Sequence, residues 1–380
     1  MPEYAVHVRG RRETYAMKMY YIANARMPND KAHGIQLAKM CEAFIASGVD
    51  VTLVVSRGSG NLKEFYDLTY DIPLVRLPVL QLGYRLAALQ FSIVSLIYVW
   101  IRSLYEKFVV YTIDMDSFSF APLIWAPGPL FAEMHTCKKP LLFVRWFFNR
   151  AGIIATNQPI AEGLVQTFRL SQKRICIEPN GVDESAVQNT LSQREARTKL
   201  GLPLDESFAL YVGRFYEWKG LEILADAALH SPLPIHIVGG TRGEYERVTD
   251  RSGETLHFAG IRPVSEVPLW LAAADVLLVL GTMKAAYSSH QTSPMKIFEY
   301  LATHHATVAS RTPALQSIMS EKTAFWYEPD NTASLVQAIH EAYTSSNAEE
   351  RIQAGRALAV EHTWRRRAER IIAFIHAYGN

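Results

Sequence analysis

The chain has 380 residues, which is too long for one compact core and suits two domains of ordinary size. Hydrophobic residues make up 49% of it and charged residues 20%, and 39 Lys and Arg nearly balance 37 Asp and Glu. This composition excludes a low-complexity chain and argues against nucleic acid as the main partner. The three cysteines are widely spaced without a CxxC pair, so neither a disulfide framework nor a zinc site is predicted, and a reducing cytoplasm fits best.

Residues 1–16 are polar and basic, and they contain no apolar stretch of the kind found in a signal peptide. They offer too little apolar surface to offset the entropy of ordering. We therefore predict a disordered extension over residues 1–16, with the folded chain beginning at Met17.

Strand-like apolar runs alternate with helical patterns over nearly the whole chain, which is typical of parallel sheets with helices on both faces. The first series lies at residues 19–23, 51–56, 74–78, 108–113, 130–134, 153–157 and 175–179. The second series lies at residues 208–212, 235–238, 256–259, 276–280, 307–310 and 324–327. These patterns predict an α/β protein with two doubly wound domains and a ligand site in the cleft between them.

Two helical segments of the first series differ in character. Residues 35–47 have an amphipathic pattern that leaves Gln36, Lys39 and Glu42 toward water. Residues 86–101 are the most apolar stretch of the chain, but they include polar side chains and are short for a bilayer span. They predict a buried or partly buried helix, and an interfacial helix touching a lipid surface stays an alternative.

A turn signal, Asn180-Gly181, separates the two series. We predict an N-terminal domain over residues 17–185 and a C-terminal domain over residues 186–362. The last segment, residues 363–380, has apolar side chains at helical spacing. It is predicted to form a helix that packs back toward the N-terminal domain.

The segment Gly-Arg-Phe-Tyr-Glu-Trp-Lys-Gly, residues 213–220, follows a strand-like run and leads into a helical pattern. In an open α/β sheet the ligand crevice lies beyond the carboxyl ends of the strands. Arg214 and Lys219 are therefore expected to converge on a negatively charged ligand, for which a diphosphate is the natural candidate. An ordinary loop with two solvated basic residues is the alternative from this segment alone.

A second candidate segment begins at Ser293, which suits a helix N-cap, and continues with Pro294, which suits the first helical position. A helix start presents unpaired N–H groups and partial positive charge, which favour a phosphate. Glu299 lies in the second turn on the side of Met295 and Lys296. Its carboxylate can accept hydrogen bonds from two vicinal hydroxyls such as those of a ribose, and an exposed helix glutamate is the alternative.

These features combine into a site for a diphosphate joined to a ribose, and with them the sequence resembles glycosyltransferase family 4, retaining enzymes of the GT-B fold that use nucleotide-sugar donors. The resemblance covers the chain after Met17. It rests on Gly213-Arg214 with Lys219-Gly220, on the run Ser-Pro-Met-Lys-Ile-Phe-Glu-Tyr at residues 293–300, and on the linker at residues 179–183.

The resemblance implies a role for each matching residue of the second domain. Arg214 and Lys219 would hold the donor diphosphate during catalysis, and Glu299 would hold the ribose. The other donor-binding residues would be Gly213, Ser293, Pro294, Met295 and Lys296. The family usually has an acidic residue eight positions before the glutamate, and here that position is Gln291, whose amide can still hydrogen-bond a sugar hydroxyl.

The resemblance extends to the first domain. Gly34 stands at the start of the first helix, after a loop in which Asn29 or Asp30 could act as the cap, and would let the backbone approach the donor. His135 follows the strand-like run at residues 130–134 and is implied to be catalytic, close to the transferred sugar. Glu133 shares a strand face with His135 and could orient its ring.

We therefore expect a GT-B enzyme with two Rossmann-like domains that face each other across a cleft. It would transfer a sugar from a nucleoside-diphosphate sugar to an acceptor hydroxyl with retention of configuration, in polysaccharide or glycoconjugate biosynthesis, without a metal ion or cofactor. The acceptor would be a glycan, a lipid-linked molecule or a small molecule. The expected location is the cytoplasm, with peripheral contact at the inner face of a membrane as an option. A sugar-nucleotide epimerase of the same fold and a non-catalytic sugar-nucleotide-binding subunit are the alternatives.

Overall fold

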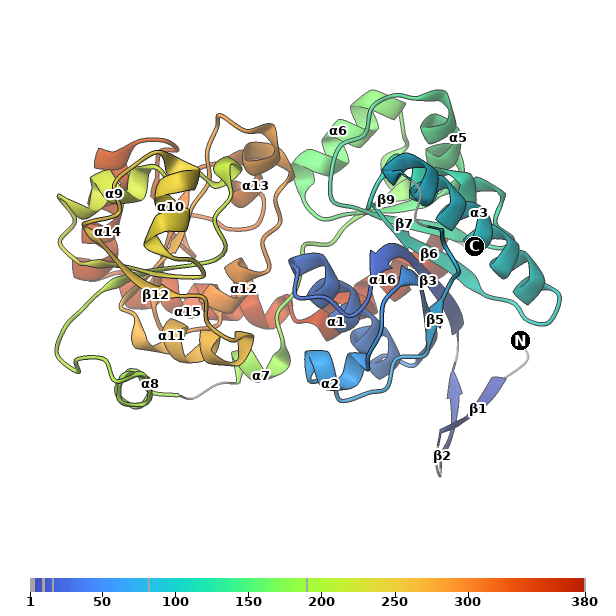
Figure 1. Ribbon diagram of the computed structural model, residues 1–380, viewed down its shortest axis with the longest axis horizontal. Coiled ribbons are helices and arrows are strands. Elements are labelled where there is room, and N and C mark those ends of the chain that lie inside the picture. Colours follow the sequence, from blue (N-terminus) through green and yellow to red (C-terminus); the bar gives the residue numbers. More distant parts are fainter. Residues whose placement is uncertain (1–3, 9–10, 16, 81–82, 189–190, 379–380) are drawn as a thin grey trace. The chain divides into compact units, whose positions relative to one another are not determined.

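A computed structural model describes residues 4–8, 11–15, 17–80, 83–188 and 191–378 of the chain (Figure 1). The chain folds into two compact units: unit 1 comprises residues 1–180 and 364–380, and unit 2 comprises residues 181–363. The unit boundaries thus follow Asn180 and Thr363, whereas the sequence pattern placed the domain ends at residues 185 and 362.

Unit 1 is built on a parallel sheet of seven strands in the order β5-β4-β3-β6-β7-β8-β9. The strands are β3 (Met17–Arg26), β4 (Val49–Arg57), β5 (Leu74–Arg76), β6 (Val109–Ile113), β7 (Leu130–Met134), β8 (Gly152–Ala155) and β9 (Ile175–Ile177). Each coincides with one of the predicted apolar runs, because strands buried on both faces are apolar almost throughout. The α/β fold class is confirmed.

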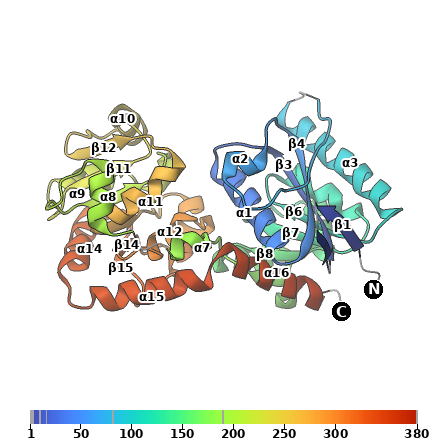
Figure 2. The same ribbon diagram turned by 90° about the horizontal axis from the view of Figure 1, so that it is seen from below.

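Helices cover both faces of this sheet, and Figure 2 shows α1 and α3 on opposite sides of it. The helical segments are α1 (Ala32–Ala46), α2 (Leu62–Tyr66), α3 (Tyr84–Ser103), α4 (Ser117–Phe120), η1 (Ala121–Trp125), α5 (Leu142–Arg150), α6 (Gln158–Phe168), η2 (Gln172–Arg174) and α16 (Trp364–Tyr378). The last of these, α16, packs against α1 and β8 within unit 1. Residues from the two ends of the chain therefore share one core.

The beginning of the chain differs from the disordered extension expected over residues 1–16. Strands β1 (Tyr4–Val8) and β2 (Arg11–Tyr15) pair as an antiparallel hairpin, with Tyr4 opposite Tyr15. Half of the residues of the two strands are valine, tyrosine or threonine, which suit extended backbone, and pairing satisfies the backbone groups that face the partner strand. Residues 1–3, 9–10 and 16 lie outside the described part of the chain.

Unit 2 has a second parallel sheet, of six strands in the order β12-β11-β10-β13-β14-β15. Its strands are β10 (Ala209–Val212), β11 (Ile235–Val238), β12 (Leu256–Gly260), β13 (Val276–Val279), β14 (Ala306–Ser310) and β15 (Phe325–Tyr327). Its helices before β13 are α7 (Glu184–Val187), α8 (Gln193–Leu200), η3 (Glu217–Lys219), α9 (Ile223–Ala228), α10 (Arg242–Thr249), η4 (Val264–Glu266) and α11 (Val267–Ala273). Its later helices are η5 (Tyr287–Gln291), α12 (Lys296–Leu301), α13 (Pro313–Gln316), α14 (Thr332–Thr344) and α15 (Ala348–Glu361).

The sheet of unit 2 has a separate apolar core on each face. Ala209 and Tyr211 of β10 point into one core, and Leu210 between them points into the other. This is the two-residue alternation of a strand that is buried on both sides. Because both faces are covered, only the ends of the strands are left to carry a polar site.

The two segments where the chain passes between the units lie side by side. Val182 forms a parallel bridge with Thr363, and its N–H donates to the carbonyl of His362 at 3.0 Å. The predicted Asn180-Gly181 turn therefore marks where unit 1 gives way to unit 2.

Candidate functional site

The strand order of the unit 2 sheet reverses between β10 and β13, which makes the carboxyl ends of these strands the expected ligand site of such a sheet. Gly213 and Arg214 directly follow β10, and Gly281 lies two residues beyond β13. The predicted cationic loop therefore starts at the point where an open α/β sheet binds its ligand.

Two lysine side chains converge at Gly213. Lys219 Nζ donates to the Arg214 carbonyl at 2.7 Å, and Lys296 Nζ donates to the Val212 carbonyl at 2.8 Å. A Cβ atom at Gly213 would lie 3.0 Å from Lys296 Nζ and 3.4 Å from Lys219 Nζ, and the φ angle of Gly213 is +150°. The backbone conformation favours glycine here, and a side chain would crowd the Lys296 ammonium group.

Burial disfavours the positively charged forms of these two lysines. Burial lowers the pKa of Lys219 to about 8. The pKa of Lys296 lies well below its usual value because of burial and, after that, the charge of Lys219. The hydrogen-bond partner of each lysine is a neutral backbone carbonyl, that of Arg214 for Lys219 and that of Val212 for Lys296. A bound polyanion would relieve this cost, so the pair suits a diphosphate.

Glu299 lies one turn into α12, close enough to Lys296 for their charges to interact. Burial raises the pKa of Glu299 to about 7, with a further contribution from the carboxylate of Asp183 in the linker. Near neutral pH this side chain is therefore divided between its ionised and protonated forms. The ionised form can accept two hydrogen bonds from vicinal hydroxyls.

The predicted start of α12 at Ser293 and Pro294 is wrong. The helix begins at Lys296, has Met295 at its N-cap position, and is six residues long. The Ile297 N–H donates to the Pro294 carbonyl at 3.2 Å, so a tight turn precedes the helix. A helix this short has a small macrodipole, and the Lys296 side chain rather than a row of helix amides supplies positive charge.

Gln291 lies at the end of a π-helical turn, η5. The ring of Tyr287 in this turn packs edge-on against Trp218, with 4.7 Å between centroids. Trp218 precedes Lys219, so the two segments that flank the lysine pair support each other. The hydrogen bond from Gln291 to a sugar hydroxyl stays a prediction.

In unit 1, Glu133 is the centre of a buried polar network. Its carboxylate accepts hydrogen bonds from Gln36 Nε2 at 2.5 Å and from the Tyr111 hydroxyl at 2.7 Å. Arg367 Nη2 lies 2.9 Å from Glu133 Oε1, and His135 Nε2 lies 3.0 Å from the same oxygen. The network joins α1, β6, β7 and α16 and fixes the His135 ring.

This network holds Glu133 ionised. Burial alone would raise the pKa of the carboxyl, but the Arg367 guanidinium and the His135 ring lower it well below its usual value. The prediction that Gln36 points toward water is wrong, because Gln36 is 2% exposed and its amide group donates to the Glu133 carboxylate. Sequence reasoning missed Gln36, Tyr111 and Arg367. The available signal was an acidic residue inside an apolar strand, which requires a partner.

Gly34 is buried in the first turn of α1. A Cβ atom there would lie 2.6 Å from Asn29 Oδ1 and 2.7 Å from the Tyr66 hydroxyl. Asn29 Oδ1 accepts from the Lys31 N–H at 3.0 Å, so Asn29 stabilises the turn before the helix, although the N-cap position itself is Lys31. Packing within this loop is thus a sufficient reason for glycine, and donor contact by Gly34 stays a prediction.

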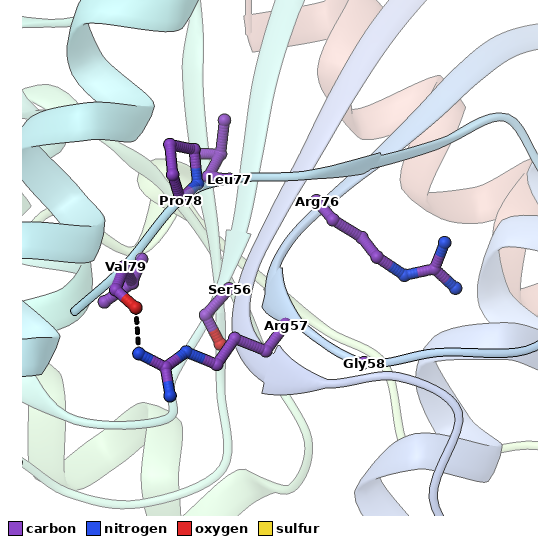
Figure 3. A pocket seen from close by; sticks show the side chains of 7 residues that line it. All are labelled: Ser56, Arg57, Gly58, Arg76, Leu77, Pro78 and Val79. Atoms are coloured by element: carbon purple, nitrogen blue, oxygen red, sulfur yellow. Dashed lines mark hydrogen bonds between the residues drawn. The ribbon is translucent and has the colours of Figure 1, made fainter. Parts of the chain in front are cut away.

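A pocket of about 470 Å³ lies at the carboxyl ends of β4 and β5, and none of the predicted site residues lines it (Figure 3). It is lined by Ser56, Arg57, Gly58, Arg76, Leu77, Pro78 and Val79. Figure 3 shows Arg57 donating to the Val79 carbonyl, while Arg76 points the opposite way and donates to the Gly60 carbonyl at 2.8 Å. Guanidinium groups beside apolar side chains suit a ligand with an acidic group on an apolar body.

Solved structures resemble the whole chain at low sequence identity. A glycosyltransferase from Rickettsia africae has a TM-score of 0.73 at 14% identity, covering 95% of this chain and 98% of that one. HepE of Anabaena in complex with UDP-glucose has a TM-score of 0.69 at 18% identity, covering 95% and 100%. These likenesses identify the fold as GT-B, with two Rossmann-like domains.

Curated relatives match shorter parts of the chain. D-inositol 3-phosphate glycosyltransferase of Xylanimonas cellulosilytica is 34% identical over 144 residues, which is 33% of this chain and 34% of that protein. The putative teichuronic acid biosynthesis glycosyltransferase TuaC of Bacillus subtilis is 27% identical over 200 residues, or 52% and 48%. The chain thus spans a third to a half of the lengths of these two relatives.

Two family models match adjacent parts of the chain. The model described as Glycosyltransferase Family 4 matches residues 34–186, and the model described as Glycosyl transferases group 1 matches residues 206–345. The first falls almost wholly in unit 1 and the second entirely in unit 2. The chain therefore belongs to the family 4-like glycosyltransferases of the GT-B fold.

Proposed function

We propose that the protein transfers a sugar from a nucleoside-diphosphate sugar to an acceptor hydroxyl, with retention of anomeric configuration and without a metal ion. The observation that carries this proposal is the convergence of Lys219 Nζ and Lys296 Nζ at Gly213, at the reversal point of the unit 2 sheet. UDP-glucose is bound by HepE, which has the same fold. The nucleotide-sugar donor of this chain is inferred from that likeness and from the lysine pair.

The chemistry follows from the charge that develops during transfer. When the bond between sugar and diphosphate breaks, negative charge grows on the phosphate and positive charge grows on the sugar. Lys219, Lys296 and Arg214 would stabilise the leaving diphosphate as fixed cations, in place of a metal ion. Glu299 would accept the ribose hydroxyls and Gln291 a sugar hydroxyl.

We further propose that the acceptor attacks on the face from which the diphosphate leaves, assisted by the leaving group. No residue of the chain is assigned as a nucleophile, and His135, held by Glu133, keeps the catalytic role that the family resemblance implies. Trapping of a covalent glycosyl-enzyme intermediate would contradict same-face attack. The acceptor is proposed to be a glycan or a lipid-linked or small molecule, with the enzyme in the cytoplasm and in contact with a membrane surface.

Donor binding can be tested by thermal unfolding with UDP-, GDP-, ADP- and TDP-sugars. One donor class is expected to stabilise the protein, by about 2.7 kcal/mol at about a hundred times its Kd. The same donor should then be consumed only when an acceptor is present. Stabilisation by no donor would contradict the proposal, an epimer formed without acceptor would favour an epimerase, and binding without transfer would favour a non-catalytic subunit.

Donor affinity is expected to be highest between about pH 7 and pH 8. The pKa of Glu299 is raised to about 7, so this carboxyl is mostly ionised above pH 7. The pKa of Lys219 is lowered to about 8, so this amine is mostly protonated below pH 8. Titration calorimetry from below pH 7 to above pH 8 should show the Kd for the donor rising in both directions away from this range. The pKa values of Glu299 and Lys219 in the free protein set its two limits.

Two variants separate the limits of this pH range. Glu299→Gln cannot ionise, so its donor affinity should be weaker and should no longer fall in acid. Lys219→Arg keeps its charge throughout, so the alkaline loss of affinity should become smaller, and the loss that remains should come from Lys296, whose pKa is also lowered. If both variants keep the pH dependence of the unaltered protein, these two groups do not set it.

A further inference from the structure

Helix α3 carries an apolar stripe that faces outward. Its members recur every three or four residues along one side of the helix and are between 37% and 76% exposed. They are Leu86, Leu89, Ile93, Ile97, Trp100 and Leu104. Single exposed apolar residues are ordinary on a protein surface, but a continuous stripe of them marks an interaction site.

The opposite side of α3 anchors the helix in unit 1. Ala88, Phe91 and Val99 are no more than 1% exposed and pack into the unit 1 core. Among the described residues, one helix, at residues 85–103, is long and apolar enough by length and composition to cross a membrane, and 28% of its apolar stretch is buried. A helix fixed in the core along one side can lie on a bilayer but cannot leave the fold to span it.

Neighbouring segments extend the stripe. Trp100 Nε1 donates to the Trp125 carbonyl at 2.9 Å, and Trp125, at the end of η1, is 61% exposed. Helix α5, which packs against η1 and shares the apolar core of α3, exposes Leu142 and Trp146. We call this combined surface of α3, η1 and α5 the α3–α5 face. Exposed tryptophans are typical of the boundary between apolar and aqueous layers of a membrane.

Basic residues outnumber acidic residues in the segments that form the α3–α5 face. Residues 84–107 contain three basic residues and residues 138–150 contain four, and the one acid in these segments is Glu106. Glu106 pairs with Lys18 at 3.1 Å and with Arg102 at 2.6 Å, and Lys138 pairs with Asp114. Five cations of these segments have no carboxylate partner among the described ion pairs: Arg85, Lys107, Lys139, Arg145 and Arg150. The whole chain is nearly balanced, so this local excess is a property of the face. Basic residues bordering an apolar surface attract it to anionic lipid headgroups.

We propose that the α3–α5 face docks the protein on an anionic lipid surface, with α3 lying in the plane of the headgroups and its outward stripe buried among the acyl chains. This inference names the docking surface and the class of lipid for the membrane contact proposed above, so it rests on the proposed function. A second copy of the chain fits this face less well, because two copies would bring their basic residues together. The two lysines of the donor site are not part of it.

Vesicle sedimentation tests the proposal without any sugar transfer. The protein is expected to bind vesicles of equal parts phosphatidylcholine and phosphatidylglycerol, and to bind vesicles of phosphatidylcholine alone more weakly. The triple variant Leu89→Gln, Ile93→Gln, Ile97→Gln should lose at least about tenfold in partitioning to the mixed vesicles. The matched control, Ile261→Gln with Val264→Gln, changes two exposed apolar residues of unit 2 and should bind as the unaltered protein does.

The outcomes separate this surface from the donor site. Donor-induced stabilisation should be the same in the triple variant and the unaltered protein, which also shows that the variant is folded. Equal vesicle binding by both would overturn the proposal, as would a dimer in solution that the triple variant abolishes. Loss of donor binding in all forms with intact vesicle binding would instead contradict the proposed function alone.

Discussion

Replacing Lys219 with alanine is expected to lower kcat/KM for sugar transfer about a hundredfold, by analogy with the loss of one donor to a developing anion. Lys219 Nζ borders Gly213 together with Lys296 Nζ, and burial has already lowered its pKa to about 8. Burial thus disfavours its positive charge, and an anionic ligand would stabilise that charge. The measurement is initial-rate kinetics with the donor identified by thermal unfolding. Arg214→Ala is expected to lower the rate by more than about tenfold.

A lysine outside the site provides the control. Lys199 is an exposed residue of α8, and Lys199→Ala should leave kcat/KM within about twofold of the unaltered protein, because an isolated surface charge contributes little. Lys219→Arg should retain part of the activity, since the charge remains while the compact ammonium group is lost. Near-normal transfer by both Lys219→Ala and Arg214→Ala would sink the assignment of the donor site.

The sheets were predictable from the sequence because parallel strands buried on both faces leave an unmistakable pattern. All thirteen strands from β3 to β15 coincide with predicted apolar runs. The N-terminal hairpin was missed, since the sequence of its strands carries charged residues and shows no long run of apolar residues. The start of α12 was misplaced because Ser293 and Pro294 satisfy the rules for a helix start, while the tight turn after Pro294 delays the helix to Lys296.

The candidate site was predictable in its residue types but only partly in its geometry. The cations and the carboxylate follow strand ends or helix starts, and such positions can be read from the sequence. The Lys296 side chain is held at the site by a hydrogen bond to the Val212 carbonyl, which is 84 residues away in the chain, so no local pattern predicts its position. The link between Glu133 and Arg367 spans 234 residues, and no local pattern indicates which of 39 basic residues completes that pair.

Replacing Arg367 with methionine is expected to lower the free energy of unfolding by about 3–5 kcal/mol, because it leaves a buried carboxylate without its partner. The side chains of Arg367 and Glu133 are both fully buried, and Arg367 also donates to the Pro179 carbonyl at 2.7 Å. The variant should lose sugar transfer as well, since Glu133 then no longer holds His135 as it does now. Urea unfolding at neutral pH measures the first effect and initial-rate kinetics the second.

The pH dependence identifies the cause of this loss. In the unaltered protein the depressed pKa of Glu133 contributes stability above its ordinary value of 4.5, and this contribution is lost as pH falls through the folded-state value. Without Arg367, that pKa should rise, because burial is then opposed chiefly by the His135 ring. The deficit of the variant should therefore shrink as the solution is acidified and Glu133 takes up a proton. Glu133→Gln should remove part of the deficit when combined with Arg367→Met.

The matched control is Arg365→Met, which breaks an exposed pair with Glu369 on the same helix and should cost less than about 1 kcal/mol. A deficit of similar size in both arginine variants, or one that does not change with pH, would show that Glu133 needs no buried cation.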